Sequence, residues 1–212
     1  IDVAHAERCP LPFLSCMVDD CLKKGKSVQE GGAVYNFTGP QGFGIANMAD
    51  GLFAVRQLVY DEKKISMKEL KEALIWNYDK GLDAQSAGDI GTEILKAMKA
   101  AGRNVDASTA AAVLNSLIGM KPEPDKLSRF KEIHDMIDEV PKFGNDIPEV
   151  DYFAREVAYT YTKPLQNYKN PRGGQFQAGL YPVSANVPLG GQTGATPDGR
   201  YAHTPVADGV SP

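Results

Sequence analysis

The sequence has 212 residues, of which 42% are hydrophobic and 24% are charged, an ordinary globular composition rather than a disordered or collagen-like one. Its 23 lysine and arginine residues are outnumbered by 27 aspartate and glutamate residues, so no basic excess exists to neutralise a nucleic acid backbone. There is no apolar run of about 18 residues and no charged-then-apolar secretory leader. These features predict a cytoplasmic protein with no nucleic-acid partner and no membrane contact.

Apolar residues that return every three or four positions predict helices through the first two thirds of the chain. Caps and breakers set the expected boundaries: Ser66 and Glu69 have the spacing of a capping box, and Gly25 is a typical helix stop. The expected helices are residues 11–24, a helix capped by Asn47 that carries Leu52, Val55, Leu58 and Val59, a helix from Ser66 to about Gly81, a hairpin over 89–119 that turns at Gly102-Arg103-Asn104, a helix from about Asp125, and a helix capped by Asp146 that Pro164 closes.

After Pro164 the helical repeat stops, and residues 165–212 hold eight of the 21 glycines. This composition predicts loops with short strands. The best strand candidate is 177–183, and 186–189 is short enough to be only an edge segment. The open end at Gly209-Val210-Ser211-Pro212, together with the absence of an initiator methionine, leads us to expect a piece of a longer chain.

Several groups of residues could form a metal-binding or nucleotide-binding site, but their spacing favours structural roles. Cys9, Cys16 and Cys21 with His5 do not have a zinc-site spacing, and we interpret them as buried thiols. The glycine-rich run 39–44 lacks the spacing of a nucleotide loop, which favours a tight buried turn.

Three further features also favour structural roles. Asp198 and Arg200 are placed to pair locally in a Pro-Asp-Gly turn. His134 is interpreted as a core or boundary histidine. The tyrosines at helical spacing are interpreted as core residues, namely Tyr152, Tyr159 and Tyr161 with Tyr168 beyond them.

Long motifs in one order carry more information than any single one. They are His5-Ala-Glu-Arg with Pro12-Phe-Leu-Ser, the run from Gly31 to Asn47 (GGAVYNFTGPQGFGIAN), Asn170-Pro-Arg-Gly-Gly, the run from Gly179 to Gly190 (GLYPVSANVPLG), Gly194-Ala-Thr-Pro-Asp-Gly-Arg and Ala207-Asp-Gly-Val-Ser-Pro. In this order the motifs resemble those of the glycyl radical enzymes, the pyruvate formate-lyase-like family, and the form of the Gly31 run is more similar to the eliminase and dehydratase branch.

The resemblance implies an α/β fold, in which residues 1–212 are part of a ten-stranded barrel, mostly helices here with short strands near the C-terminal end. It also implies a glycyl radical, installed by a separate activating enzyme that uses S-adenosylmethionine and an iron–sulfur cluster, and a homodimer of the full-length protein. The cysteine loop and the radical glycine segment of the family do not occur in this sequence. We therefore expect no catalytic residue, cofactor or metal ligand in this chain, and no activity from it alone.

What the chain is expected to supply is part of the wall around a small-molecule substrate. By resemblance, Tyr181 matches the position where eliminating members place a tyrosine near the substrate, and Ala195 and Thr196 match the loop that follows. Asn186, Val187 and Pro188 are expected to shape the floor of the same pocket. The alternative for Tyr181 is an aromatic core residue.

The reaction implied by the resemblance is radical cleavage of a carbon–heteroatom bond, as in glycerol and propanediol dehydratases, choline trimethylamine-lyase and isethionate sulfite-lyase. Residues 83–122 match no family motif and are interpreted as a helical insertion, which favours the sulfite-lyase. Two alternatives stay open: acyl transfer as in pyruvate formate-lyase (formate C-acetyltransferase), and a non-catalytic helical module. Half a barrel would expose apolar faces, so we expect aggregation of the isolated chain.

Overall fold

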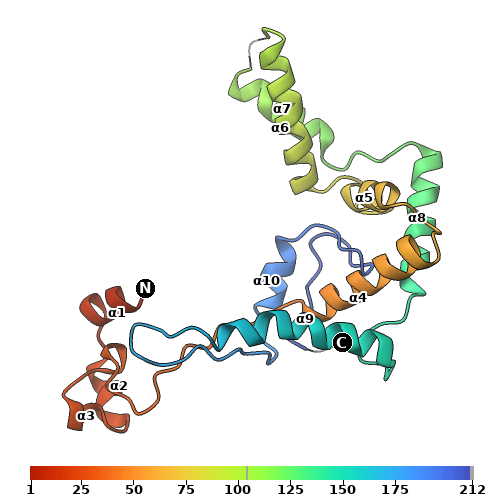
Figure 1. Cartoon of the computed structure of the whole chain (residues 1–212). Helices are drawn as coiled ribbons and strands as arrows, with labels where there is room; N and C mark the ends of the chain where they lie inside the picture. Colours follow the sequence, from red (N-terminus) through yellow and green to blue (C-terminus); the bar gives the residue numbers. More distant parts are fainter. Residues whose placement is uncertain (104, 211–212) are drawn as a thin grey trace. The chain divides into compact units, whose positions relative to one another are not determined.

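The computed structural model describes residues 1–103 and 105–210, without the side chains of 84 and 85. Helices dominate it, as Figure 1 shows. They are α1 (Asp2–Arg8), α2 (Pro12–Met17), α3 (Cys21–Lys24), α4 (Ile45–Val55), α5 (Met67–Ile75), α6 (Ala84–Ala100), α7 (Ala107–Leu117), α8 (Pro124–Asp138), α9 (Pro148–Leu165) and α10 (Asn186–Gly191), with a 3-10 turn at Val28–Glu30 and a π-helical turn at Arg56–Asp61.

The chain divides into two compact units. Unit 1 comprises Ile1–Gly42 and Arg155–Tyr181, and unit 2 comprises Phe43–Ala154 and Pro182–Pro212. The chain passes from one unit to the other just before α4, between residues 42 and 43, and again within α9, between residues 154 and 155. It passes a third time between residues 181 and 182. The single partial barrel domain expected over 1–212 stays a prediction, and each unit is described by itself.

The main core lies in unit 2, where α5 packs on α8 around the π-helical turn that extends α4. Its fully buried side chains come from these elements and the turns that follow them, and the largest are Leu58, Tyr78, Ile133 and Ile137. Removing side chains of this size from water supplies about 1.5–3 kcal/mol each, which is what holds α5 and α8 together.

The capping box is confirmed: the backbone N–H of Glu69 donates to Ser66 Oγ at 3.1 Å, and the N–H of Ser66 donates to Glu69 Oε2 at 2.8 Å. These bonds, with Arg129 of α8 at 3.1 Å, lower the pKa of Glu69. The helix ends at Ile75, short of the expected Gly81, because Asn77 and Tyr78 take positive φ values of 50° and 54° that a helix does not allow.

The helical hairpin is confirmed as α6 and α7, which pack on each other. Asp83 and Asp106 cap the two helices by accepting from the backbone N–H of Ser86 and Thr109. Gly102 turns the chain with φ 74°, while Asn104 of the predicted turn lies outside the described residues. At its base the hairpin is closed by Leu82, which bonds the backbone of residues 119 and 120 at 2.9 Å each. That this segment is an insertion stays a prediction.

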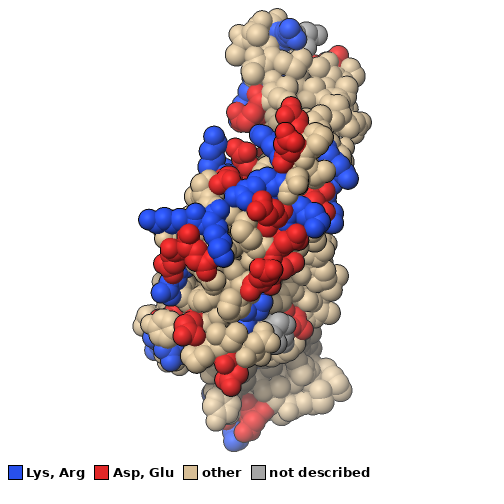
Figure 2. Space-filling view, turned by 90° about the vertical axis from the view of Figure 1, so that its right-hand side faces the viewer, with Lys and Arg blue, Asp and Glu red and all other residues tan. Residues whose placement is uncertain are grey.

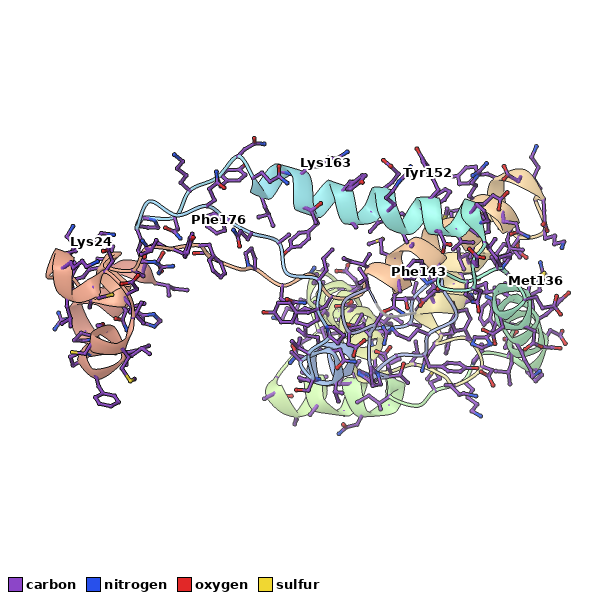
Figure 3. The ribbon with its side chains drawn as sticks, turned by 90° about the horizontal axis from the view of Figure 1, so that it is seen from below. Lys24, Met136, Phe143, Tyr152, Lys163 and Phe176 are labelled. Carbon is purple, nitrogen blue, oxygen red and sulfur yellow. The ribbon has the colours of Figure 1, made fainter. Side chains whose placement is uncertain are left out.

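Unit 1 is built around two extended segments that run parallel. Thr38 bridges Phe176, and Gln41 bridges Gly179, so residues 38–42 lie beside 175–179. Figure 3 shows Phe176 on the extended segment that follows α9. Asn170 fixes the start of the pair, because its amide donates to the carbonyl oxygen of Asn36 and to Thr38 Oγ1.

The predicted short strands near the C-terminal end are wrong for the described residues. The segment 177–183 forms only an isolated bridge at Gly179, and 186–189 lies within helix α10. Only isolated bridges form because Pro40, in the middle of the partner segment 38–42, has no N–H to donate, which interrupts the ladder between Thr38 and Gln41. Among residues 1–103 and 105–210 no strand of an α/β barrel is therefore seen.

Three local predictions are also corrected. The helix expected over 11–24 is broken into α2 and α3, because Asp20 takes a left-handed conformation with φ 78°. Gly44, not Asn47, is the N-cap of α4, and Asp146 has φ 57° and lies two residues before Pro148 opens α9. The glycine run 39–44 is not a buried turn, because none of its residues is buried and Gln41 pairs through a bridge with Gly179.

The tyrosines and cysteines lie less deeply than expected. Tyr152, Tyr159 and Tyr168 are exposed, because the buried residues of α9 are Val150 and Ala154. Lys163 covers the ring of Tyr159, with Nζ 3.9 Å from the centroid. Cys21 is buried, whereas Cys9 and Cys16 are exposed.

Figure 2 shows acidic and basic side chains interspersed on the face it draws, with no single-sign field. Arg129 illustrates the pattern, because it pairs with both Glu69 and Glu132. In the described part of the chain no helix is long and apolar enough to cross a membrane.

Candidate functional site

The six expected pocket residues fall in both units. Tyr181 ends unit 1, while Asn186, Val187, Pro188, Ala195 and Thr196 belong to unit 2. Each group is therefore taken within its own unit. The structure brings the last five together on α10 and the loop that follows it.

Tyr181 presents its side chain to the outside while its main chain is fixed. Its side chain is 61% exposed, which rules out the alternative of an aromatic core residue within unit 1. Its carbonyl oxygen accepts a hydrogen bond from Gln41 Nε2, and two residues earlier Gly179 exchanges backbone bonds with Pro40 and Gly42 at 2.8 and 2.9 Å. An exposed ring on a fixed backbone can contact a bound molecule at a defined position, as a residue in the wall of a substrate pocket must.

On α10 the side chain of Asn186 is held by a hydrogen bond, whereas Val187 and Pro188 are exposed. Asn186 Nδ2 donates to the carbonyl oxygen of Val206 at 3.0 Å, and the N–H of Val206 returns a bond of 3.3 Å to the Asn186 carbonyl. Val187 and Pro188 are exposed. Asn186 therefore holds the helix in place, and Val187 and Pro188 are the side chains available for contact.

Thr196 is held by several hydrogen bonds and Ala195 by packing. The Thr196 carbonyl accepts from Tyr78 Oη at 2.7 Å, and its hydroxyl accepts from Arg200 Nε at 3.1 Å. Ala195 packs against the main core. The Thr196 side chain is thus used to shape its own loop.

Arg200 and the neighbouring aromatic rings rigidify this loop. Arg200 donates to the carbonyl oxygens of Gly194, Tyr201 and Thr204, so it does not form the predicted local pair with Asp198. Burial lowers the pKa of Arg200 from its very high ordinary value. His134 stacks on Tyr201 with centroids 4.6 Å apart, and its Nε2 donates to the Gly199 carbonyl at 2.8 Å. His134 is thereby confirmed as a satisfied core histidine.

A second set of polar contacts ties the loop to α4. Asn47 Nδ2 donates to Asp198 Oδ2 at 2.6 Å, while Asn47 Oδ1 accepts from the N–H of Ala207 at 2.6 Å. Lys142 Nζ donates to the Asp198 carbonyl at 2.9 Å. The sequence predicted Asn47 to be a helix cap. An asparagine side chain can either cap a helix or link two segments, and only the position of Ala207 in space shows that Asn47 links them.

Asp50 of α4 and Lys142 are close enough to interact electrostatically. Burial raises the pKa of Asp50, although the N–H of Phe143, labelled in Figure 3, donates to its carboxylate at 2.7 Å. Burial likewise lowers the pKa of Lys142, and the charges of Asp50 and Asp198 oppose that shift. The charge of each group reduces the cost of burying the other, so we assign this pair a structural role.

An apolar hollow of about 240 Å³ lies between α4 and the loop. Its walls include Met48, Leu52, Pro197 and Val206, with Thr196 at its edge. Gly51 has little room for a side chain there, since a Cβ would lie 3.4 Å from Pro197 Cγ. Among the described residues no group of three or more His, Cys, Asp or Glu side chains is placed to hold a metal ion.

Comparison with known proteins identifies the family of the chain. The family model described as "Pyruvate formate lyase-like" matches residues 1–190. A structure described for 1,2-propanediol dehydration in Roseburia inulinivorans is 62% identical over 100% of this chain and 25% of its own, with a TM-score of 0.90. The glycerol dehydratase of Clostridium butyricum is 45% identical over 100% of this chain and 21% of its own, with a TM-score of 0.70.

A curated relative, the (2S)-3-sulfopropanediol dehydratase of Klebsiella oxytoca, is 32% identical over 100% of this chain and 20% of its own length. The chain thus spans about a fifth of the length of the curated relatives that it matches. Because the order of the motifs, the family match and the likeness along the whole chain agree, the chain belongs to the pyruvate formate-lyase-like family of glycyl radical enzymes.

Proposed function

We propose that this chain forms part of the substrate wall in a glycyl radical dehydratase that removes water from a small 1,2-diol. The observation that carries the proposal is 62% identity over the whole chain to a protein described for 1,2-propanediol dehydration, with a TM-score of 0.90. The glycerol dehydratase at 45% identity supports the same substrate class.

In the proposed reaction a thiyl radical takes a hydrogen atom from the carbon that bears one hydroxyl group. The neighbouring carbon then loses its hydroxyl as water, which takes up the proton of the remaining hydroxyl group, and the carbon that lost the water regains a hydrogen atom from the thiol. The products are an aldehyde and water, so the reaction needs no external oxidant or reductant. Closing the chamber against water protects the radicals, and this chain contributes wall residues to that chamber.

Within this scheme Tyr181 contacts the substrate with its exposed ring, and Val187 and Pro188 present apolar surface from α10. Asn186, Ala195 and Thr196 hold the shape of the wall through the contacts described above. The radical cysteine and glycine lie in other parts of a longer protein. That protein forms a ten-stranded barrel, acts as a homodimer and receives its radical from an S-adenosylmethionine iron–sulfur activating enzyme.

Diol dehydration is favoured over the sulfite-lyase reaction that the insertion suggested, because both solved relatives named above are described for dehydration. The same relatives disfavour acyl transfer and a non-catalytic module. The 212-residue chain alone is proposed to be inactive.

The test uses the full-length protein, activated without oxygen and supplied separately with 1,2-propanediol, glycerol and isethionate. We expect an aldehyde from a diol and no sulfite from isethionate. Sulfite release, or no turnover of any diol by a protein whose glycyl radical is visible by electron paramagnetic resonance, would overturn the proposal. The chain alone, treated identically, should give neither the radical signal nor product.

The wall assignment has its own test in the same enzyme. Tyr181→Phe is expected to lower kcat/KM about tenfold without changing the melting temperature, because a group that orients the substrate is lost. Tyr168→Phe is the matched control, since Tyr168 is an exposed tyrosine of the same unit with no proposed role. Equal kinetics for the two variants would remove Tyr181 from the wall.

A further inference from the structure

We propose that Gln41 is a positioning residue for the reaction, which sets the place of Tyr181 through its main chain. The inference rests on the proposed function of Tyr181 and adds a residue from the distant run 39–44. Gln41 and Tyr181 are 140 positions apart and lie in the same unit.

The first step is the direct contact. Gln41 Nε2 donates to the carbonyl oxygen of Tyr181. A carbonyl can only accept, so the orientation of the Gln41 amide is fixed with its nitrogen toward Tyr181. No described residue hydrogen-bonds the Tyr181 hydroxyl, and the ring is 61% exposed, so within unit 1 the main chain determines where the ring stands.

The second step is the close packing around Gln41. Its Oε1 is buried and has no hydrogen-bond partner among the described residues, because it lies against the α-carbon of Gly179. A Cβ added at Gly179 would be 2.3 Å from Gln41 Oε1 and 3.0 Å from Tyr181 Cε1. The Gln41 amide is therefore closely packed between Gly179 and the Tyr181 carbonyl.

The third step links the pair to a helix. Tyr161 of α9 donates from its hydroxyl to the carbonyl oxygen of Pro40 at 2.6 Å, directly before Gln41. Gly179 then joins Pro40 and Gly42 through backbone bonds of 2.8 and 2.9 Å. A continuous set of hydrogen bonds therefore runs from a regular helix to the Tyr181 backbone, and Gln41 supplies its last bond.

The experiment compares variants of the activated full-length enzyme. Gln41→Ala and Gln41→Glu should each lower kcat/KM about tenfold, since displacement of a reacting-site group by less than 1 Å has effects of this order. The Glu variant keeps the shape of the side chain but replaces the donor by an acceptor. Gly179→Ala should also lower kcat/KM, because its methyl group would meet both the Gln41 amide and the Tyr181 ring.

Gln29→Ala is the matched control. Gln29 is a glutamine of the same unit that also bonds backbone groups, at Leu11 and Cys9, away from Tyr181. It should leave kcat/KM unchanged. Melting temperature and radical content are measured for every variant, so that a loss of folding or of activation is separated from a loss of positioning.

The decisive readout is the double variant. If Gln41 acts through Tyr181, Gln41→Ala should cost less than about twofold in a Tyr181→Phe background, because the hydroxyl it places is already gone. Additive losses, or wild-type kcat/KM for Gln41→Glu, would overturn the inference and leave the wall role of Tyr181 intact. If Tyr181→Phe instead left kcat/KM unchanged, the wall assignment would be overturned, and this inference with it.

Discussion

The hydroxyl of Tyr78 donates a hydrogen bond of 2.7 Å to the carbonyl oxygen of Thr196, 118 positions further along the chain. Tyr78 is fully buried and has a positive φ of 54°, and Asn77 beside it, with φ 50°, accepts the N–H of Ala202 at 2.8 Å. Two adjacent residues in a disfavoured conformation thus hold both ends of the loop that carries Ala195 and Thr196.

Tyr78→Phe should destabilise the protein by about 1–3 kcal/mol, because the Thr196 carbonyl loses its buried donor while the ring still fills the core. Denaturant unfolding measures the change. Tyr60→Phe serves as the control, since Tyr60 is an exposed tyrosine of the same unit. Equal midpoints for the two variants would show that the bond to Thr196 does not contribute to stability.

Adjacent glycines at the end of α10 should respond oppositely to alanine. A Cβ at Gly190 would lie 2.3 Å from the Thr204 carbonyl oxygen and 2.5 Å from Pro205 Cα, both backbone atoms that cannot swing aside. Gly190→Ala should therefore cost about 3 kcal/mol or prevent folding. Gly191 has nothing within 4 Å of that position, and Gly191→Ala should be neutral or slightly stabilising. Similar melting temperatures for both variants would contradict the packing described here.

The cap of α7 should make stability depend on pH in the acid range. Bonds from the backbone N–H and hydroxyl of Thr109 lower the pKa of Asp106 from 3.8 to about 2. Since the pKa is lower in the folded state, the stabilisation is fully present above pH 3.8 and is lost as the pH falls toward 2.

Asp106→Asn tests this dependence because asparagine keeps a good cap without the charge. The wild type should melt at a higher temperature than the variant at pH 6, and the gap should close near pH 2. Asp89→Asn, in the interior of α6, is the control and should show no such gap. A gap that is constant with pH would show that the charge of Asp106 is irrelevant to folding.

The apolar surface of α2 and α3 should make the isolated chain associate. Phe13, Met17 and Leu22 are 79%, 65% and 71% exposed, which is unusual for large apolar side chains so near one another in sequence. We expect binding of a hydrophobic dye and self-association in analytical ultracentrifugation, both reduced by changing the three residues to serine. A monodisperse monomer that binds no dye would contradict this expectation.

Local sequence signals predicted local structure well. The Ser66–Glu69 box, the hairpin of α6 and α7 and the buried His134 are all confirmed. Except for His134, whose partners Gly199 and Tyr201 lie 65 or more positions away, the determining groups lie near one another in the sequence. The family was also predicted from sequence, since several long motifs in one order leave few alternatives.

Predictions failed where a distant partner decides the conformation. Asn47 has a suitable residue type for a helix cap, but Asp198 and Ala207 take both ends of its amide. The segment 186–189 was expected to be extended, yet Asn186 bonds Val206 in space and the chain closes into a helix. Gln41 was not singled out, because its importance depends on Tyr181, and only the run of glycines around it signalled a close approach of two backbones.

The two backbone bonds of Leu82 place the entrance and the exit of the α6–α7 hairpin side by side. A segment that leaves and rejoins its scaffold at one point transmits little strain to it, so its length and content can vary independently. Because the hairpin also packs on Trp76, which contacts the main core, an engineer who replaces it with a short linker or a reporter domain would need to keep the Trp76 contact covered.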